Sequence, residues 1–167
     1  MNIKICKLHP NATVPTYAHD TDACFDLYAL TVDNAHTIGA NLYHCNPVEC
    51  GTGLAFEVPP GWAMLIFSRS GHGFKHDIRL ANCVGVIDAG YTGEVRVKLT
   101  MDDTFNADDG PGHFVRPGDR IAQAMLVQVP HVSFEVVEQL ALTERGVGGF
   151  GSTDKPAMPN LLHRVQP

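Results

Sequence analysis

The 167-residue chain predicts an all-β domain, and three observations support this prediction. Short apolar or alternating segments recur along the chain, and turns rich in glycine and proline separate them at intervals of roughly 8 to 15 residues. A helical periodicity of 3.6 residues is almost absent. A sandwich, a jelly roll and a closed barrel all fit these observations, and the chain is long enough for one such domain with a core.

The first half of the chain is expected to consist of short strands separated by turns. The segment WAMLIF is apolar throughout, and we expect it to be buried on both faces of a sheet. The segment 31–50 is weakly patterned and is expected to hold strand pieces and loop. The strands expected in this half are 2–8, 22–29, pieces of 31–50, 53–58 and 62–67.

The second half begins with a stretch that could form a short helix, residues 68–76, although its glycines make it a poor one. Further on, the Pro117-Gly118 turn leads into an apolar strand over 120–129, and residues 132–137 alternate like another strand. The segment 145–154 contains too many glycines for a core strand. We therefore expect a β domain over 1–144 and a flexible arm over 145–167.

The stretch NCVGVIDAGYTGEVRVK, residues 82–98, is expected to form two strands joined by a turn that carries Asp88 and Tyr91. Gly90 and Gly93 are expected to allow backbone conformations that other residues avoid. After the turn, apolar and charged residues alternate with the period of a half-buried strand. On this basis Val95, Val97 and Leu99 share the buried face, and Glu94, Arg96 and Lys98 share the other.

Composition narrows the possible functions. The formal net charge of −6 argues against a nucleic-acid-binding surface, which is normally basic. No apolar run is long enough to span a membrane, and residues 1–10 do not resemble a signal peptide. The five cysteines include no CxxC pair and are expected to be reduced thiols. A cytoplasmic protein is expected, or one of the host cytoplasm if the chain is viral.

Four clusters contain residues that packing does not explain: Asp26, Arg69-Ser70-Gly71, Asp88 with Tyr91, and Arg145 with the glycine-rich run that follows it. An arginine, a hydroxyl and a glycine in sequence suit a phosphate, although a surface turn is the commoner explanation of so short a motif. The run after Arg145 repeats these groups and adds Phe150, whose ring offers a flat face for a base. A solvated terminus is the simpler alternative for that run.

Taken together, RSG, GVIDAGYTGE, GDRIAQ and RGVGGFGST, with an acidic residue in ACFDL, resemble the five ordered motifs of the trimeric dUTPases. The resemblance extends over residues 23–153. It implies a jelly-roll-like distorted barrel, a homotrimer with active sites at subunit interfaces, and a swapped glycine-rich C-terminal arm. The implied reaction is the Mg²⁺-dependent hydrolysis of dUTP to dUMP and pyrophosphate by attack of water on the α-phosphate. That reaction keeps uracil out of DNA and supplies dUMP.

The resemblance also implies roles for individual residues. Asp88 would be the catalytic base, since an ionised carboxylate can accept a proton from water. Asp26 would contact Mg²⁺ through water, because this ion commonly keeps several water ligands. The residues expected to bind substrate are Arg69, Ser70, Gly71, Asn82, Val86, Ile87, Tyr91, Arg96, Gln123, Arg145, Phe150, Gly151, Ser152 and Thr153.

Within that set, Asn82 and the backbone around Val86 and Ile87 would contact the uracil, and Tyr91 would lie against the deoxyribose. The RSG motif, Gln123 and the arm would hold the phosphates, and Phe150 would cover the base. For Arg96, an exposed strand position is at least as good an explanation.

The chain departs from the family pattern at Cys24, where glycine is usual, at Ser68, where proline is usual, and at Asp154, where glycine is usual. Two other functions remain possible: a dCTP deaminase, which shares the fold, and a nucleotide-sensing module without catalysis. The glycine-rich arm and the presence of Lys98 near the expected glutamate of the deaminases argue against the first. The intact set of Asp88, Tyr91, Gln123 and Arg145 argues against the second.

Overall fold

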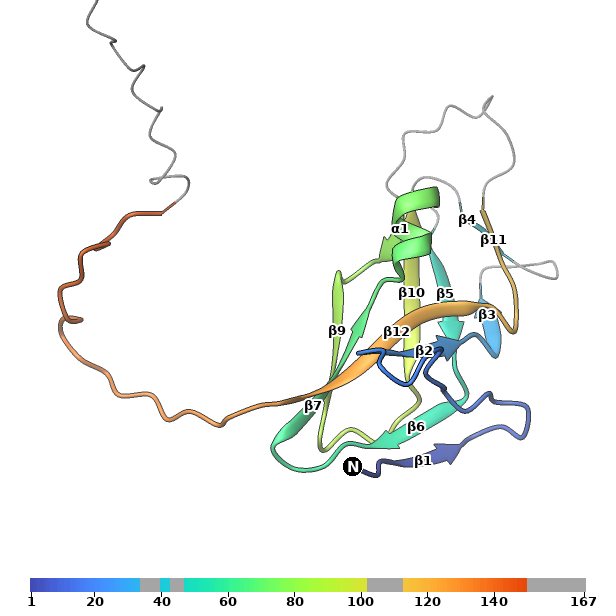
Figure 1. Cartoon of the computed structure of the whole chain (residues 1–167), viewed down its shortest axis with the longest axis horizontal. Helices are drawn as coiled ribbons and strands as arrows, with labels where there is room; N and C mark the ends of the chain where they lie inside the picture. The colour runs from blue at the N-terminus through green and yellow to red at the C-terminus, as the bar shows by residue number, and fades with distance from the viewer. Residues whose placement is uncertain (34–39, 43–46, 102–112, 150–167) are drawn as a thin grey trace, which may run out of the picture. The chain divides into compact units, whose positions relative to one another are not determined.

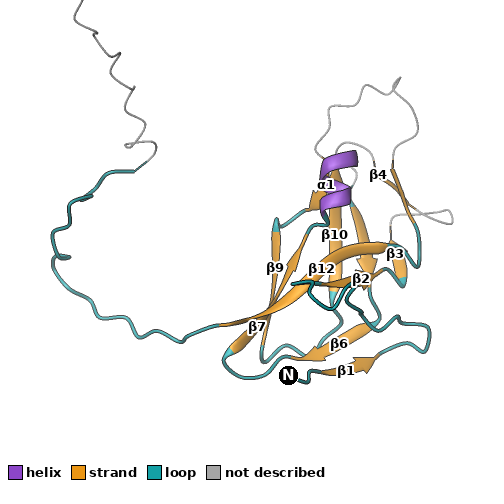
Figure 2. Cartoon of the chain, in the orientation of Figure 1, coloured by secondary structure: helices purple, strands orange, loops and turns teal. Residues whose placement is uncertain are grey.

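The structure is a computed structural model that describes residues 1–33, 40–42, 47–101 and 113–149. It confirms the all-β prediction, because the described chain consists of short strands and one short helix (Figures 1 and 2). The strands are β1 (Lys4–Lys7), β2 (Phe25–Tyr28), β3 (Thr31–Asp33), β4 (Ala40–Leu42), β5 (Val48–Gly51), β6 (Leu54–Glu57), β7 (Trp62–Phe67), β8 (Ile78–Leu80), β9 (Val84–Asp88), β10 (Arg96–Met101), β11 (His113–Val115) and β12 (Arg120–Gln128), and the helix is α1 (Ser70–His76). None of the described segments is a helix that could cross a membrane.

The chain divides into two units, Met1–His131 and Val132–Pro167, and every strand and the helix belong to the first. Two four-stranded sheets dominate this first unit. One has the strand order β2-β12-β7-β9, and the other has the order β3-β5-β10-β8. Two pairs, β1-β6 and β11-β4, complete the described pairing. All of these pairs are antiparallel.

The core is formed by the inward faces of these sheets. In β10 the predicted alternation is confirmed, since Val97 and Leu99 are buried while Arg96 and Lys98 are exposed. In β7 the prediction of burial on both faces was wrong. Met64 and Ile66 are buried, whereas Leu65 is only half-buried. The outward side of β7 is therefore apolar but only partly buried in the single chain.

The stretch 82–98 also differs from the prediction of a simple hairpin. β9 pairs with β7 and β10 pairs with β5 and β8, so the two strands belong to different sheets and the turn between them crosses from one sheet to the other. The glycines of this turn do not have a positive φ. Among described residues in this region, it is Cys83 that adopts the left-handed conformation, with φ 62°.

The segment Val132–Val137 alternates in sequence but forms no strand in the structure. Its side chains are exposed, with Phe134 92% and Val136 99% accessible. A strand needs a neighbouring strand for its backbone hydrogen bonds, and the described part of the chain provides none for this segment. The alternation therefore shows only that the segment can pair.

Candidate active site

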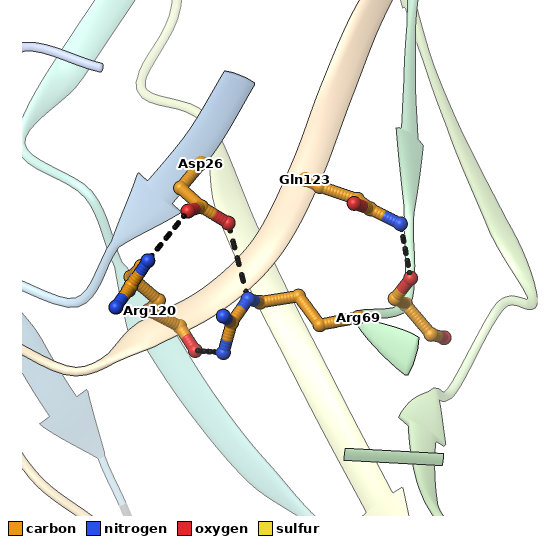
Figure 3. Close-up of polar contacts among 5 residues, drawn as sticks. Asp26, Arg69, Arg120 and Gln123 are labelled. Carbon is orange, nitrogen blue, oxygen red and sulfur yellow. Dashed lines mark hydrogen bonds and ion pairs between the residues drawn. The ribbon is translucent and has the colours of Figure 1, made fainter. Parts of the chain in front are cut away.

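The outward face of the β2-β12-β7-β9 sheet carries a charged cluster centred on Asp26 (Figure 3). The Nε of Arg69 donates to Asp26 Oδ1 over 3.1 Å, and the Nη1 of Arg120 donates to Asp26 Oδ2 over 3.1 Å. Arg69 Nη1 also donates to the carbonyl oxygen of Arg120, at 3.2 Å. Both oxygens of one carboxylate thus orient two guanidinium groups, and the Asp26 side chain is only 13% exposed.

Arg120 is a site residue that sequence reasoning missed, and the structure shows why. Residues three apart on a regular strand face opposite sides of the sheet, which would put Arg120 and Gln123 on opposite faces. The register of β12 against β2 shifts between Arg120 and Ala122, so Ile121 is an extra residue. Such a bulge re-aims the side chains beside it. As a result, Arg120 and Gln123 lie on the same face, opposite Tyr28 and Asp26.

Ser68, at the end of β7, links this cluster to the neighbouring sheet. Its carbonyl oxygen accepts a hydrogen bond from Gln123 Nε2 over 3.0 Å, which fixes the amide beside the arginines (Figure 3). Its hydroxyl oxygen accepts a hydrogen bond from the backbone N–H of Leu80 in β8, at 2.9 Å. A proline at this position, as in the family pattern, could not make the second contact, so the departure at Ser68 has a structural role of its own.

The cluster borders a cavity of about 470 Å³, which we call the Asp26 cavity. This volume is within the range of small-molecule sites. Four residues that the sequence predicted to bind nucleotide or metal, Asp26, Arg69, Ser70 and Gln123, line it together. The full lining is Ala18, Asp22, Ala23, Cys24, Asp26, Arg69, Ser70, Arg120 and Gln123. Two guanidinium groups and a hydroxyl give this cavity the donors that a phosphate requires.

Cys24, which replaces the glycine of the family pattern, also lines the Asp26 cavity. Burial and the carboxylates of Asp22 and Asp26 raise the pKa of the Cys24 thiol above its usual value. The side chain is therefore a neutral thiol near pH 7 and adds no negative charge beside the arginines.

A second cavity, of about 490 Å³, lies between β9 and β10, and we call it the Asn82 cavity. Asn82 and Arg96, both predicted from the sequence to contact substrate, line it with Gly85. A β-carbon at Gly85 would lie only 3.2 Å from the Cβ of Ile66, so glycine accommodates the close approach of β7 at this point. The remaining lining residues are Ile66, Leu80, Ala81, Val97 and Lys98.

β9 is the edge strand of its sheet among the described strands, and it pairs with β7. Its other edge offers backbone N–H and C=O groups, including those near Val86 and Ile87. A flat base whose edge alternates donors and acceptors can satisfy such groups, as can the Asn82 amide. Arg96 is less available, because its Nη2 lies 3.8 Å from Glu49 Oε2 and 2.6 Å from Asp33 Oδ2.

Asp88 and Tyr91 lie at the exposed turn that leaves β9. The backbone N–H of Tyr91 donates to the carbonyl oxygen of Asp88 over 3.0 Å, which closes the turn. The phenol hydroxyl donates to the carbonyl oxygen of Glu94 over 2.8 Å. The hydroxyl is therefore bound next to the turn that carries the ring, and the side chain is 45% exposed.

Asp88 and the Asp26 cluster share one face of the sheet but not one end of it. The register runs Asp26, Gln123, Phe67 and Val84 across the four strands, whereas Asp88 is paired with Ala63. Gln123 and Asp88 are thus two strands apart and four residues apart along the sheet. Strand spacings convert this offset into a separation on the order of 15 Å. A water held by Asp88 cannot reach a phosphate bound to Gln123 of the same chain.

The arm belongs to the second unit, and the structure describes it as far as residue 149. Arg145 Nε donates to the carbonyl oxygen of Gly148 over 2.9 Å, and the N–H of Gly146 donates to the carbonyl oxygen of Thr143 over 3.1 Å. Gly146 has φ 52°, a value that favours glycine. The predicted residues Phe150, Gly151, Ser152 and Thr153 lie outside the described residues, as does Asp154.

The predicted Mg²⁺ contact can be compared with the donor groups present. Among the described residues, no group of three or more His, Cys, Asp or Glu side chains could hold a metal ion. Asp26 already accepts hydrogen bonds from two arginines, whose charges disfavour a cation bound directly to the carboxylate. Each carboxylate oxygen still has a second lone pair, which fits a contact through water.

Comparison with known proteins gives one consistent answer. The dUTPase family model matches residues 10–154. The deoxyuridine 5'-triphosphate nucleotidohydrolase of Picosynechococcus sp. is 37% identical over 155 residues, which covers 92% of this chain and 99% of that protein. That of Bordetella avium is 40% identical, with 93% of this chain and 97% of that protein covered.

Among solved structures, a variant of the Staphylococcus bacteriophage 80alpha dUTPase with dUpNHpp is similar, with a TM-score of 0.74 and 26% identity. The match covers 91% of this chain and 98% of that one. A dUTPase from phage phi11 of S. aureus, described with a structural Mg(II) ion, has the same fold, with a TM-score of 0.69. At 22% identity, with 83% of this chain and 98% of that one covered, the latter comparison supports the fold alone.

Proposed function

Because this chain belongs to the dUTPase family, we propose that it hydrolyses dUTP to dUMP and pyrophosphate. The observation that best supports this proposal is the grouping of Asp26, Arg69, Ser70 and Gln123 around one cavity on the sheet face that also carries Asp88. These are the donors and the carboxylate that phosphoryl transfer from a nucleotide requires.

In the proposed reaction, Asp88 accepts a proton from water while the water oxygen attacks the α-phosphorus in line. The bond between this phosphorus and the oxygen that bridges to the β-phosphate breaks, and pyrophosphate leaves with the electron pair. Asp88 is exposed at the end of β9, where a carboxylate can meet both water and substrate. The guanidinium groups of Arg69 and Arg120 stabilise the charge on the phosphates.

The base is proposed to bind in the Asn82 cavity, with Asn82 and the backbone near Val86 and Ile87 contacting the uracil edge. Tyr91 is proposed to lie against C2′ of the deoxyribose and exclude a 2′-hydroxyl. Ser70 and Gly71, at the start of α1, and Gln123 are proposed to contact phosphate. Arg145, Ser152 and Thr153 are proposed to hold the γ-phosphate, while Phe150 and Gly151 close over the base.

We further propose a homotrimer whose active sites combine residues of different copies. The separation on the order of 15 Å between Asp88 and Gln123 supports this, because one chain cannot present both to the same phosphate. The apolar outward side chains between them also support it. Leu65, Met125 and Val127 are half-buried, and Val86 is 58% exposed. Another copy of the chain would cover this face.

When bound with the triphosphate, Mg²⁺ would supply charge neutralisation on the phosphate oxygens. Asp26 would contact a water ligand of the ion. In the structure, Asp26 accepts hydrogen bonds from Arg69 and Arg120.

A pyrophosphate-release assay with dUTP, dCTP, dTTP and UTP tests the function. Release from dUTP in preference to the others is expected. Loss of ammonia from dCTP without pyrophosphate release would instead identify a deaminase. Tight binding of dUTP without turnover would identify a nucleotide sensor. Either of these results would overturn the proposed hydrolysis.

A further inference from the structure

Resting on the proposed function, we infer that Glu94 is a positioning residue that fixes the Tyr91 ring and thereby sets the preference for deoxyribose over ribose. Glu94 follows the turn that carries Asp88 and Tyr91 and immediately precedes the buried Val95. It contacts that turn through its backbone and a turn of the β5–β6 connection through its side chain.

The backbone contact holds the phenol. The Tyr91 hydroxyl donates to the carbonyl oxygen of Glu94 over 2.8 Å. The ring lies so close to Gly93 that a β-carbon there would be 2.6 Å from the hydroxyl oxygen and 2.8 Å from Cζ. Only glycine allows this approach, so the ring orientation depends on where the backbone of residues 93 and 94 lies.

The side-chain contact holds that backbone. Glu94 Oε1 accepts a hydrogen bond from the N–H of Gly53 over 2.8 Å. A β-carbon added at Gly51 would be only 2.7 Å from the same oxygen, so a side chain at position 51 would displace the carboxylate. Gly53 has φ 67° and is packed against Leu30, which makes its N–H a fixed donor.

The acceptor side of this contact is fixed as well. Thr52 is fully buried, and its hydroxyl donates to the carbonyl oxygen of Val95 over 2.7 Å. The N–H of Val95 donates to the carbonyl oxygen of Leu54 over 2.9 Å. Residues 51–54 thus hold the Glu94 side chain in place. The Glu94 backbone in turn holds the Tyr91 hydroxyl. A steric gate rejects a 2′-hydroxyl only if its ring cannot move aside.

Two conservative variants separate reach from charge. Glu94→Gln keeps the oxygen that accepts from Gly53 but removes the charge, whereas Glu94→Asp keeps the charge but shortens the side chain by one methylene. The ratio of kcat/KM for dUTP to that for UTP is measured for each. We expect Glu94→Asp to lower this ratio about 10-fold, as expected for the loss of one hydrogen bond to a charged acceptor. Glu94→Gln should lower the ratio by less than Glu94→Asp does, because an uncharged acceptor remains at the same position.

The link to Tyr91 is tested by combining variants. In a Tyr91→Ala background there is no ring to position, so adding Glu94→Asp should change the ratio no further. Glu57→Asp makes the same chemical change at an exposed glutamate of β6 and should leave the ratio unchanged. Circular dichroism and thermal melting test whether each variant is folded.

An unchanged ratio in Glu94→Asp, or an equal further loss in the Tyr91→Ala background, would overturn the inference. The ratio can be measured, whatever its value, only if the wild type hydrolyses dUTP. If the wild type has no such activity, the proposed function itself is wrong, and that outcome is distinct from a failure of the role of Glu94.

Discussion

At the scale of single residues, Asp88 is the side chain whose proposed role has the clearest physical test. Asp88→Asn preserves size and removes the proton acceptor, so kcat should fall by at least ~10²-fold, the lower end for loss of a general base. The affinity for a non-hydrolysable dUTP analogue should be retained, because Asp88 is not proposed to bind the phosphates. Steady-state kinetics and isothermal calorimetry measure the two effects.

Near-normal turnover of the Asn variant would remove Asp88 from the role of base. Glu57→Gln is a matched control, since Glu57 pairs with Lys4 on an exposed edge away from both cavities.

The cysteines make a second prediction at this scale. Burial, with a smaller effect of nearby carboxylates, raises the pKa of Cys50 in β5 to about 12. At pH 8, iodoacetamide should therefore modify the exposed Cys6 and Cys83 but leave Cys50 intact until the protein unfolds. Peptide mass spectrometry of native and urea-unfolded samples gives the answer. Rapid native modification of Cys50 would contradict its burial.

The raised pKa of the Cys50 thiol also predicts how the free energy of unfolding depends on pH. An unfolded cysteine titrates near pH 8.5, whereas folded Cys50 keeps its proton to about pH 12. The unfolded chain thus releases this proton first as pH rises. The contribution of Cys50 to the free energy of unfolding is complete below about pH 8.5 and declines between there and pH 12.

At the scale of elements, sequence patterns predicted burial best where a strand has one solvent-exposed face and one buried face. The alternation of Val95, Val97 and Leu99 with charged residues predicted the faces of β10 correctly, because burial of one face determines that pattern. The all-apolar β7 was misread, since its composition does not distinguish a half-buried face from a face buried in the core. The alternating segment 132–137 lacks a strand because alternation does not supply a partner.

The candidate site was partly predictable for a similar reason. Asp26, Arg69, Ser70 and Gln123 could be predicted because they belong to short motifs that resemble those of the family. In the structure they line one cavity. Arg120 was missed because its orientation depends on the bulge at Ile121, which breaks the period-2 rule. The one sequence signal for it is a pair of consecutive apolar residues, Ile121 and Ala122, after a charged one. The role of Glu94 depends on contacts with residues about 40 positions away, which no local pattern reveals.

The arm provides a prediction at the scale of an element. Removing residues 145–167 should leave the first unit folded and assembled, because the core lies within Met1–His131. Turnover of dUTP should collapse, since the arm is proposed to exclude water and contact the γ-phosphate. Circular dichroism, light scattering and the pyrophosphate assay measure the three properties. A truncated protein that is unfolded or monomeric would show a structural arm, and full activity would show a dispensable one.

At the scale of the whole molecule, a site shared between copies predicts complementation. Asp88→Asn and Arg69→Ala should each be inactive alone, because every site lacks one required group. In hybrids formed by co-expression at equal levels, a site can combine an intact Asp88 from one copy with an intact Arg69 from another. In a hybrid trimer of either composition, one of the three sites then has both intact groups.

Activity of tandem-purified hybrids, with both tags present, measures this recovery. Persistent inactivity of hybrids that contain both variants would indicate that each chain builds its own site. A mixture of separately purified variants without subunit exchange is the control, and it should remain inactive.

Because of the bulge in β12, the number of residues in this strand matters as well as their type. Ile121→Val keeps the residue count and should cost only about 0.5–1.5 kcal/mol. Deletion of the Ile121 codon restores regular pairing and keeps Arg120 on the face of Gln123, but it removes a fully buried side chain from the core and should cost about 2–5 kcal/mol. In this part of the gene, selection would act more severely on the number of codons than on which aliphatic residue each one encodes.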